Sequence, residues 1–374
     1  MLKSKTMGLI FANMHDSAVS GMTAIRSMAS LPFGSSYRQI DFYLSGLVNR
    51  GVHQVGVIVN KNYHSLMDHI GTGREWDLDR KLTGISIFPP FSDAESKEVS
   101  SGRISSLSGI INYITDSNAE YVILMGCDHV ANIDFEALVN EHIDSDADIT
   151  MLCCDLPYNP VMVQDCVVVT PDETGRIRDI MINTAAAKGS HYSMNVLVIS
   201  RKLLAELVKQ ASSHMKTSFE RDVLAANIDT LDIRCAMHEG FVRRIYSVRS
   251  YFEADMALLD RDVRAALFTE SNPIYTKRHD DPPTKYGLDC KVTNSNLGNG
   301  CVIDGIVENS ILGREVRICK GAVVRNCVLF KGDVVGEGAE LSCVIADKEV
   351  SISGGTKLSG NLSYPMYLSK YAHV

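Results

Sequence analysis

The chain has 374 residues, of which 45% are hydrophobic and 22% are charged, and its formal net charge is −8. That length exceeds what a single hydrophobic core usually spans, so we expect two domains in a globular protein. The acidic balance argues against nucleic acid or an anionic membrane surface as a partner. The most notable apolar run, residues 121–126, is too short to cross a bilayer.

The N-terminal segment and the cysteines both favour a cytoplasmic protein. Residues 1–14 combine a few basic side chains with a very short apolar stretch, which is a poor match to a signal peptide. The cysteines, ten in number, include no Cys-X-X-Cys pair, and no histidine lies at the spacing of a zinc site. We therefore expect buried, reduced thiols rather than a metal centre.

Up to residue 267 the pattern alternates between short apolar strands and amphipathic helices. Expected strands are 8–12, 55–60, 85–88, 121–126, 149–154 and 167–170, and expected helices are 37–50, 63–69, 104–114 and 133–142. Nearly continuous apolar strands separated by helices predict an α/β domain with a mostly parallel sheet covered on both faces. Ligands of such sheets bind at the carboxyl ends of the strands, so we expect the chemistry in the segments that follow residues 12 and 125.

Residues 271–290 break this rhythm with prolines and clustered charges, which indicates a linker or an extended strap. Beyond them, aliphatic residues recur about every five or six positions between Gly, Asn and Ser. The recurring positions are Val302, Val307, Ile311, Val316, Val323, Val328, Val334, Ala339, Val344 and Val350. This period predicts a parallel β-helix, because a β-sandwich would space its strands by roughly eight to twelve residues. The predicted units are therefore a domain over 1–270, a strap over 271–290 and a β-helix over 291–374.

Two motifs carry a resemblance to a known family. The stretches "LPFGSSYRQIDFYLSGLVNRGVHQVGVIVNKNYHSLMDHIGTGREWDL", from Leu31, and "GCDHVANIDFEAL", from Gly126, resemble signatures of bacterial glucose-1-phosphate adenylyltransferases, or ADP-glucose pyrophosphorylases. The resemblance covers nearly the whole chain, and "GREWDLDRK" at residues 73–81 is typical of the D-type regulatory subunits of the glycogen-synthesis enzyme. It implies a Rossmann-like nucleotidyltransferase domain followed by a left-handed parallel β-helix.

The chemistry of that family defines what an active member needs. The enzyme joins glucose 1-phosphate to the α-phosphate of ATP and releases pyrophosphate, while Mg²⁺ and cationic side chains stabilise the charge on the phosphates. An active site therefore needs a glycine-rich loop, a cation beside it, two carboxylates for Mg²⁺ and a cation for the sugar phosphate.

The loop and its cation are the first departures from this pattern. Where active relatives carry adjacent glycines, residues 12–22 read "ANMHDSAVSGM", and their side chains oppose close approach of the backbone to a triphosphate. We expect His15, Asp16 and Ser17 to form a polar turn instead, and a loop that binds a smaller anion is the alternative. Arg26 is retained, but the resemblance places Met28 where active relatives have a lysine.

The carboxylates for the metal are incomplete as well. Asp128 follows the predicted strand 121–126, where the first metal aspartate of the family belongs, but the resemblance places Arg244 at the position of the second. A guanidinium cannot bind Mg²⁺ and would repel it. We expect no metal site, and Asp128 is either a surviving half-site or a carboxylate that caps a loop or helix.

The sugar side of the family pattern matches in part. Ser193 fits, but Asn195 replaces a glycine, and Asn183 stands where the family has a lysine for the sugar phosphate. Ser36 stands where many relatives have a lysine that is linked to activation by sugar phosphates. The predicted remnants of the nucleotide and sugar pocket are Arg26, Asp128 and Ser193.

These departures predict a non-catalytic or very weakly active regulatory subunit. It would require no cofactor, with Mg²⁺ only in its catalytic partner. That partner is expected to be a catalytic glucose-1-phosphate adenylyltransferase subunit, in a hetero-oligomer such as a tetramer. A homo-oligomer of this chain alone stays open.

Two alternative functions stay open. The first is an active adenylyltransferase with a rebuilt site, whose carriers would be His15, Asp16, Arg26 and Asp128. The second is a binding module that senses a sugar phosphate or another anion through Arg243 and Arg244.

Overall fold

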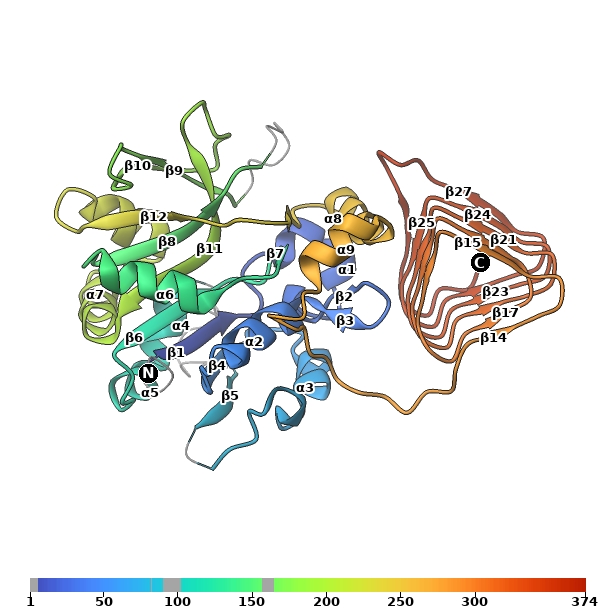
Figure 1. Cartoon of the computed structure of the whole chain (residues 1–374), viewed down its shortest axis with the longest axis horizontal. Helices are drawn as coiled ribbons and strands as arrows, with labels where there is room; N and C mark the ends of the chain where they lie inside the picture. The colour runs from blue at the N-terminus through green and yellow to red at the C-terminus, as the bar shows by residue number, and fades with distance from the viewer. Residues whose placement is uncertain (1–5, 82, 90–101, 157–164) are drawn as a thin grey trace.

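The computed structural model of the chain describes residues 6–81, 83–89, 102–156 and 165–374, and Figure 1 shows two domains side by side. The first domain is built on a twisted sheet with helices around it, and the second is a prism of stacked strands. An extended segment, residues 268–284, connects the two domains.

Within the described residues, the central sheet of the α/β domain has nine strands, and it is mostly parallel, as predicted. Their order is β10-β9-β11-β6-β1-β4-β5, with β8 paired to β11 and β12 paired to β8. Strand β1 is parallel to β4 and β6, whereas β11 runs antiparallel to β6, β8 and β9. The strands are β1 Thr6–Phe11, β4 Gln54–Ile58, β5 Gly84–Phe88, β6 Tyr121–Met125, β8 Ile149–Cys154, β9 Val167–Pro171, β10 Ile177–Ile182, β11 His191–Ser200 and β12 Ile233–Met237. The long antiparallel strand β11 is an element that the sequence pattern did not predict.

Apolar clusters cover both faces of this sheet, which explains why its strands lack a polar and apolar alternation. Strand β1 is buried at every position, with Leu9 in one apolar cluster and the adjacent Ile10 in another. The helices of the domain are α1 Ser20–Thr23, α2 Gln39–Asn49, α3 His64–Ile70, α4 Arg103–Gly109, α5 Ile111–Thr115, α6 Phe135–Asp144, α7 Arg201–Ser213, α8 Val248–Met256 and α9 Arg261–Leu267. The predicted helix 104–114 is divided at Ile110 into α4 and α5. In the described parts of the chain, no helix is long and apolar enough to span a membrane.

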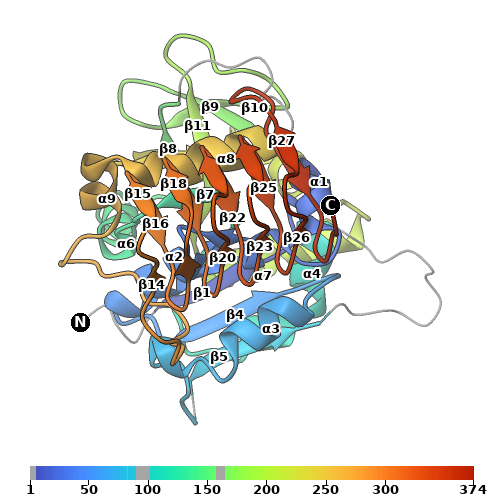
Figure 2. The same cartoon turned by 90° about the vertical axis from the view of Figure 1, so that its right-hand side faces the viewer.

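The second domain is the predicted left-handed parallel β-helix, and three five-stranded parallel sheets form its sides. The first sheet contains β14 Lys285–Tyr286, β17 Val302–Ile303, β20 Arg317–Ile318, β23 Val334–Val335 and β26 Ser351–Ile352. The second contains β15 Lys291–Thr293, β18 Ile306–Glu308, β21 Val323–Arg325, β24 Glu340–Ser342 and β27 Lys357–Ser359. The third contains β16 Asn296–Leu297, β19 Ile311–Leu312, β22 Val328–Leu329, β25 Val344–Ala346 and β28 Met366–Leu368. Figure 2 shows these strands stacked from coil to coil.

The aliphatic period of the sequence mixes two faces of the prism. In the first sheet, Ile303 and Val335 are fully buried in the interior, whereas the preceding Val302 and Val334 are half-buried on the outside. Val323 in the second sheet is also half-buried, beside the buried Val324. Successive residues of a strand point to opposite faces, and a pattern of adjacent aliphatic residues does not show which one points inward.

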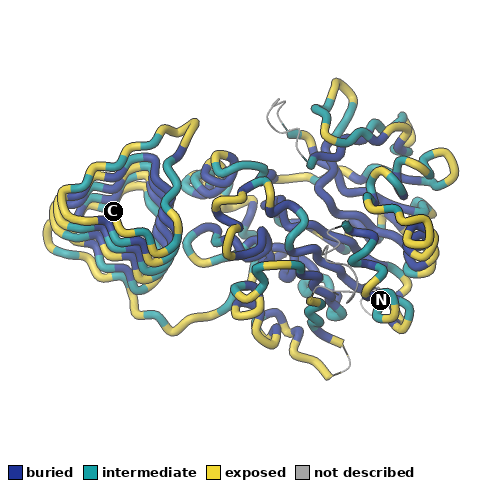
Figure 3. The backbone as a smooth tube through the Cα atoms, turned by 180° about the vertical axis from the view of Figure 1, so that it is seen from behind, coloured by how far each residue is buried: buried dark blue, intermediate teal, exposed yellow. Residues whose placement is uncertain are grey.

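The third sheet of the prism packs against the α/β domain. Strands β19, β22 and β25 are buried at every position, since one residue faces the prism interior and the next faces the neighbouring domain. Ile311, Val328 and Phe330 accordingly belong to the same apolar cluster as Tyr251 of helix α8, whose ring lies 6.2 Å from that of Phe330, edge to face. Figure 3 shows buried residues along this side of the prism. The two domains therefore share an apolar core, and we do not expect them to move independently like domains joined only by a flexible linker.

Candidate functional site

Asp128 is the centre of a buried polar cluster at the carboxyl ends of β1 and β6, where the parallel-sheet rule placed the chemistry. Its side chain has no exposure to solvent. One oxygen, Oδ1, lies 3.0 Å from Nδ1 of His129, and both oxygens accept hydrogen bonds from Nδ2 of Asn195 at 3.1 and 3.0 Å. The other oxygen, Oδ2, accepts a hydrogen bond from Nε of Arg244 at 3.2 Å and lies 3.7 Å from Nε2 of His15.

Strand β13, Val242–Arg244, brings the guanidinium of Arg244 to Asp128. It pairs antiparallel with β7, His129–Ala131, so that Arg244 lies opposite His129, and the N–H of Ile245 donates to the Asp128 carbonyl at 2.7 Å. The structure thus joins the two residues that the resemblance placed at the family's two metal-binding positions.

The charges around Asp128 keep it ionised although it is buried. Burial by itself would raise its pKa, but the imidazoles of His129 and His15 and the guanidinium of Arg244 outweigh that effect and hold the pKa well below its usual range. A divalent cation would have to approach this carboxylate beside a fixed positive charge, which opposes binding. The donor set around Asp128 therefore does not fit Mg²⁺.

The loop between β1 and α1 fills the space in front of Asp128. Asp16 accepts hydrogen bonds from the N–H of Met28 and from Nδ2 of Asn13, both at 2.7 Å, and its side chain is buried. Burial raises the pKa of Asp16 to about 6 despite these bonds. His15 is buried as well, and its Nε2 lies 3.1 Å from Nδ2 of Asn195. We call residues 12–20 the plug. Its side chains make the contacts in this region, whereas a phosphate-binding loop presents its backbone N–H groups to the phosphates.

Neither Met28 nor Arg26 supplies the cation that catalysis would need. The side chain of Met28 is buried in the apolar cluster of the α/β domain. Arg26 points to the other domain, where its Nη2 lies 2.6 Å from Oδ1 of Asp347. The predicted remnant pocket of Arg26, Asp128 and Ser193 is therefore not assembled around Arg26.

The residues on the sugar side lie in turns and a bulge. The register of β11 against β8 shifts between Ser193 and Val196, and Asn195 in this bulge has a φ of 57°. That left-handed conformation suits glycine or asparagine, which explains why asparagine can stand where the family has glycine. The Oγ of Ser193 accepts the Asn195 N–H at 3.2 Å. Asn183 also has a φ of 57°, lies exposed in a turn and accepts the N–H of Asp165 at 2.8 Å.

Arg243 and Arg244 do not face the same side of β13. Arg244 is buried against Asp128, while Arg243 is exposed and its guanidinium lies 4.9 Å from the ring centroid of Phe241. Neighbouring strand residues point in opposite directions, so an anion held by both guanidiniums does not fit this geometry.

Arg103 is a further buried residue beside the loop of residues 12–20, and the sequence pattern did not single it out. It begins α4, and its Nη1 lies 2.6 Å from Oε1 of Glu220. The guanidinium covers the ring of Phe11 at 5.0 Å, and its Nη2 contacts Sδ of Met14 in the loop at 3.0 Å. An arginine at the start of a predicted helix is ordinarily solvent-exposed, so no signal in the sequence marks this one as buried.

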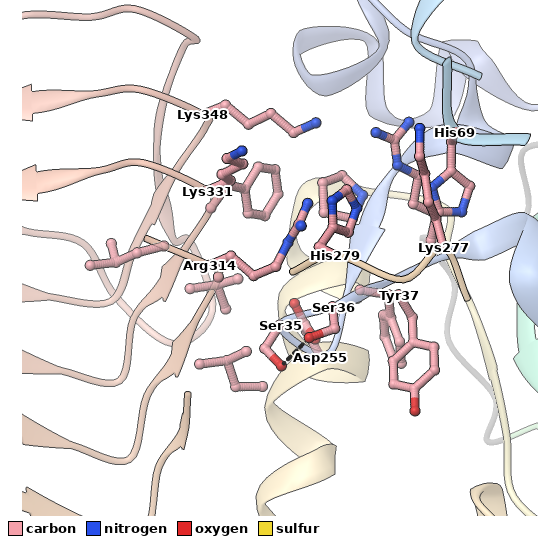
Figure 4. A pocket seen from close by; sticks show the side chains of 18 of the residues that line it. Ser35, Ser36, Tyr37, His69, Asp255, Lys277, His279, Arg314, Lys331 and Lys348 are labelled. Carbon is pink, nitrogen blue, oxygen red and sulfur yellow. Dashed lines mark hydrogen bonds between the residues drawn. The ribbon is translucent and has the colours of Figure 1, made fainter. Parts of the chain in front are cut away.

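A second polar region lies between the two domains (Figure 4). Basic side chains converge on a pocket there from the connecting segment and from the β-helix: Lys277, His279, Arg314, Lys331 and Lys348. The opposite wall carries Ser35, Ser36 and Asp255. Burial, together with the nearby charges of Arg38 and Arg26, lowers the pKa of Lys348 to about 7, and burial raises that of Asp255 to about 7. Ser36 thus lines a cationic pocket, although it carries no charge itself.

Comparisons with known proteins agree with this architecture. Residues 18–241 match the family described as Nucleotidyl transferase, and residues 282–363 match the family described as GlmU-like, C-terminal hexapeptide. The chain is 35% identical over 323 residues to "Glycogen biosynthesis protein GlgD" of Geobacillus stearothermophilus, which covers 86% of this chain and 84% of that protein. It is 31% identical over 373 residues to the protein of the same name from Bacillus subtilis (strain 168), covering 99% and 97%. It is also 31% identical over 327 residues to "Glucose-1-phosphate adenylyltransferase" of G. stearothermophilus, covering 87% and 84%.

The first prediction concerns the ion pair between Arg244 and Asp128. Arg244→Met keeps most of the side-chain volume but leaves a buried charge without its guanidinium, so we expect a loss of about 3–5 kcal/mol in the free energy of unfolding at pH 7. Arg243→Met is the matched control, since its exposed side chain should change stability by no more than about 0.5 kcal/mol. Urea unfolding measures both, and equal stabilities would contradict the assigned role of Arg244.

The second prediction concerns the pH dependence that Asp16 confers. Its pKa of about 6 in the folded state lies above the ordinary value of 3.8, so the folded state binds more protons between these values and loses stability as the pH rises through them. We compare the wild-type chain with Asp16→Asn at pH 4 and pH 7.5. The free energy of unfolding of Asp16→Asn minus that of the wild type should be greater at pH 7.5 than at pH 4, by up to about 3 kcal/mol. A shift of opposite sign would show that the hydrogen bonds from Asn13 and Met28 outweigh desolvation.

Proposed function

The chain belongs to the nucleotidyl transferase family, within the group of glucose-1-phosphate adenylyltransferases and GlgD glycogen biosynthesis proteins, and we propose that it serves glycogen synthesis as a non-catalytic, regulatory subunit. It would bind a catalytic glucose-1-phosphate adenylyltransferase chain and change the rate at which that chain makes ADP-glucose. In this proposal Mg²⁺ acts in the catalytic chain alone, and this chain requires no cofactor.

The observation that carries the proposal is the hydrogen bond of 3.2 Å between Nε of Arg244 and Oδ2 of Asp128. Nucleotidyl transfer needs metal ions and cationic groups placed against the phosphates, whereas here the guanidinium of Arg244 is engaged by the carboxylate of Asp128 and takes the place beside it that a metal ion would need. Removing one transition-state stabiliser usually costs about 10²–10³ in rate. This chain departs from the needs of catalysis at Arg244, at Met28 and in the loop around His15.

The retained fold supports a role in an assembly. The α/β domain and the β-helix share an apolar core, so the chain presents a fixed surface to a partner. An altered site within a retained fold is expected when the chain contributes its surface, rather than its site, to an assembly.

The experiment that tests this function compares the chain alone with the chain mixed with a catalytic partner. With ATP, Mg²⁺ and glucose 1-phosphate, the chain alone should form ADP-glucose no faster than a blank. After mixing, size-exclusion chromatography should show a hetero-oligomer, and the kcat or the effector response of the catalytic chain should change. Turnover by the isolated chain that Asp128→Asn abolishes would support the rebuilt-site alternative, in which His15, Asp16, Arg26 and Asp128 act. Separate elution with unchanged kinetics would overturn the regulatory role.

A second candidate function is anion sensing, and the pocket between the domains favours it. Among the described residues, Lys348 forms no ion pair with a carboxylate, while Arg314 and Lys331 are paired with Asp281 and Glu315 at 3.0 Å each. An anion in the pocket would add the counter-charge that Lys348 lacks. This sensing would use the wall of the β-helix rather than Arg243 and Arg244.

The third prediction tests this pocket with sulfate, whose own charge stays constant from pH 6 to 8. Sulfate should raise the melting temperature of the chain, and Lys348→Met should weaken the apparent affinity by about tenfold, the effect of roughly 1.4 kcal/mol from one charge pair. The affinity should also fall between pH 6 and pH 8, because Lys348, with a pKa of about 7, loses its proton there while Asp255 gains a charge. Lys357→Met is the control, since Lys357 lies on the same domain but pairs with Glu340 at 2.8 Å on the surface. An equal response of both variants would remove the pocket from consideration.

A further inference from the structure

Arg26 crosses the boundary between the domains and is fixed there by the β-helix. Its Nη2 lies 2.6 Å from Oδ1 of Asp347, directly after strand β25, and both side chains are buried, with 2% and 0% exposure. Asp347 also accepts the hydroxyl of Tyr367 on Oδ2 and the N–H of Lys348 on Oδ1, each at 2.7 Å. A buried charge pair with this many donors is expensive to open from one side, because the partner left behind stays buried and charged.

The segment that carries Arg26 is bonded directly to the plug in front of Asp128. Met28, two residues further on, donates its N–H to the carboxylate of Asp16, and Ala29 donates its N–H to the carbonyl of Ala12 at 3.2 Å. On the other side of Arg26, the hydroxyl of Thr23 donates to the carbonyl of Asp16 at 2.6 Å. A movement of Arg26 therefore acts on the plug at its first residue, Ala12, and at Asp16 in its middle.

The plug has little regular structure with which to hold itself. The plug contains a 3₁₀ turn at Asp16–Val19, and the segment that follows it contains the single-turn helix α1 at Ser20–Thr23 and a second 3₁₀ turn at Met28–Ser30. Helices this short are not stable without tertiary contacts. The β-helix also lies close to α1, since a Cβ added to Gly21 would lie 3.6 Å from the ring of Tyr367.

We propose that the β-helix domain is a latch that keeps residues 12–20 folded over Asp128, and that the ion pair between Arg26 and Asp347 is its fastening. The latch goes beyond the regulatory function proposed above, because it assigns the β-helix a task inside one chain. When the pair opens, the plug loses its anchor and the cluster around Asp128 becomes accessible. Lys348 lines the pocket between the domains and follows Asp347 directly, so an anion bound in that pocket lies beside the fastening.

The fourth prediction tests the latch by hydrogen exchange with mass spectrometry on the full chain. Asp347→Asn removes the charge that Arg26 needs, so amides in residues 13–30 should exchange about tenfold faster or more, because this segment then opens locally. Amides in β1 and β6, which carry the sheet beneath it, should change by less than about twofold. Arg26→Met should have the same effect, and the double variant should add nothing further if both residues act through one pair.

Asp333→Asn is the matched control for general damage to the β-helix. Asp333 is equally buried and accepts the N–H groups of Phe330 at 2.9 Å and Val350 at 2.8 Å, but it does not touch Arg26. Tyr367→Phe, which removes one hydroxyl from Asp347, serves if Asp347→Asn does not fold, and it should accelerate the same amides by about threefold. Unchanged exchange in residues 13–30 of the folded variants would overturn the latch, and so would equal acceleration in Asp333→Asn.

Discussion

An ionised carboxylate without access to water is the constraint around which this site is built. Asp128 is fully buried, and a buried charge needs compensation from its neighbours or it costs several kcal/mol. Strand β13 supplies Arg244, the bulge of β11 turns Asn195 toward the carboxylate, and the loop after β1 adds His15. The family resemblance implies that a metal ion would meet part of this electrostatic need in active members, whereas this chain meets it with groups that cannot leave.

The residues that depart from the family pattern fit one another as a packed structure. Met28 fills the core where a lysine would require solvent, and its backbone N–H satisfies Asp16. His15 occupies the space that adjacent glycines would leave open, and it is held by Asn195, which itself requires the left-handed backbone of the bulge. A Cβ on Gly126 would lie 3.2 Å from both Asp128 Oδ1 and Asn195 Cβ, so this region is tightly filled. Such agreement between backbone, packing and hydrogen bonds is typical of a stable alternative state rather than of a damaged site.

The β-helix is bound to this arrangement through the shared core and through Arg26. Strands of two or three residues cannot anchor a domain singly, but their stacking gives a wall in which Phe330 packs on Tyr251 and Asp347 receives Arg26. Because this interface is closely packed, we expect the two domains to keep a fixed position relative to each other. It also places the pocket around Lys348 next to the residues that hold the plug, which gives the pocket and the occluded site a physical connection.

The sequence by itself determined the architecture, and through the family resemblance it led us to expect that catalytic groups are missing. Apolar runs without alternation are read as buried parallel strands because both faces of the sheet are covered, and a short aliphatic period is read as a β-helix because each coil repeats it. The resemblance likewise places Met28, Asn183 and Arg244 at functional positions of the family, and we predicted from their side chains that they are unsuited to catalysis. The resemblance brought Arg244 and Asp128 to one site, but only the tertiary structure showed that they pair directly. Tertiary structure alone decided that Arg243 faces solvent, that Arg26 reaches Asp347, and that Arg103 lies buried on Phe11. Each of these outcomes depends on contacts between residues far apart in the chain, and residue type and local spacing carry no information about which distant partner a charged side chain will meet.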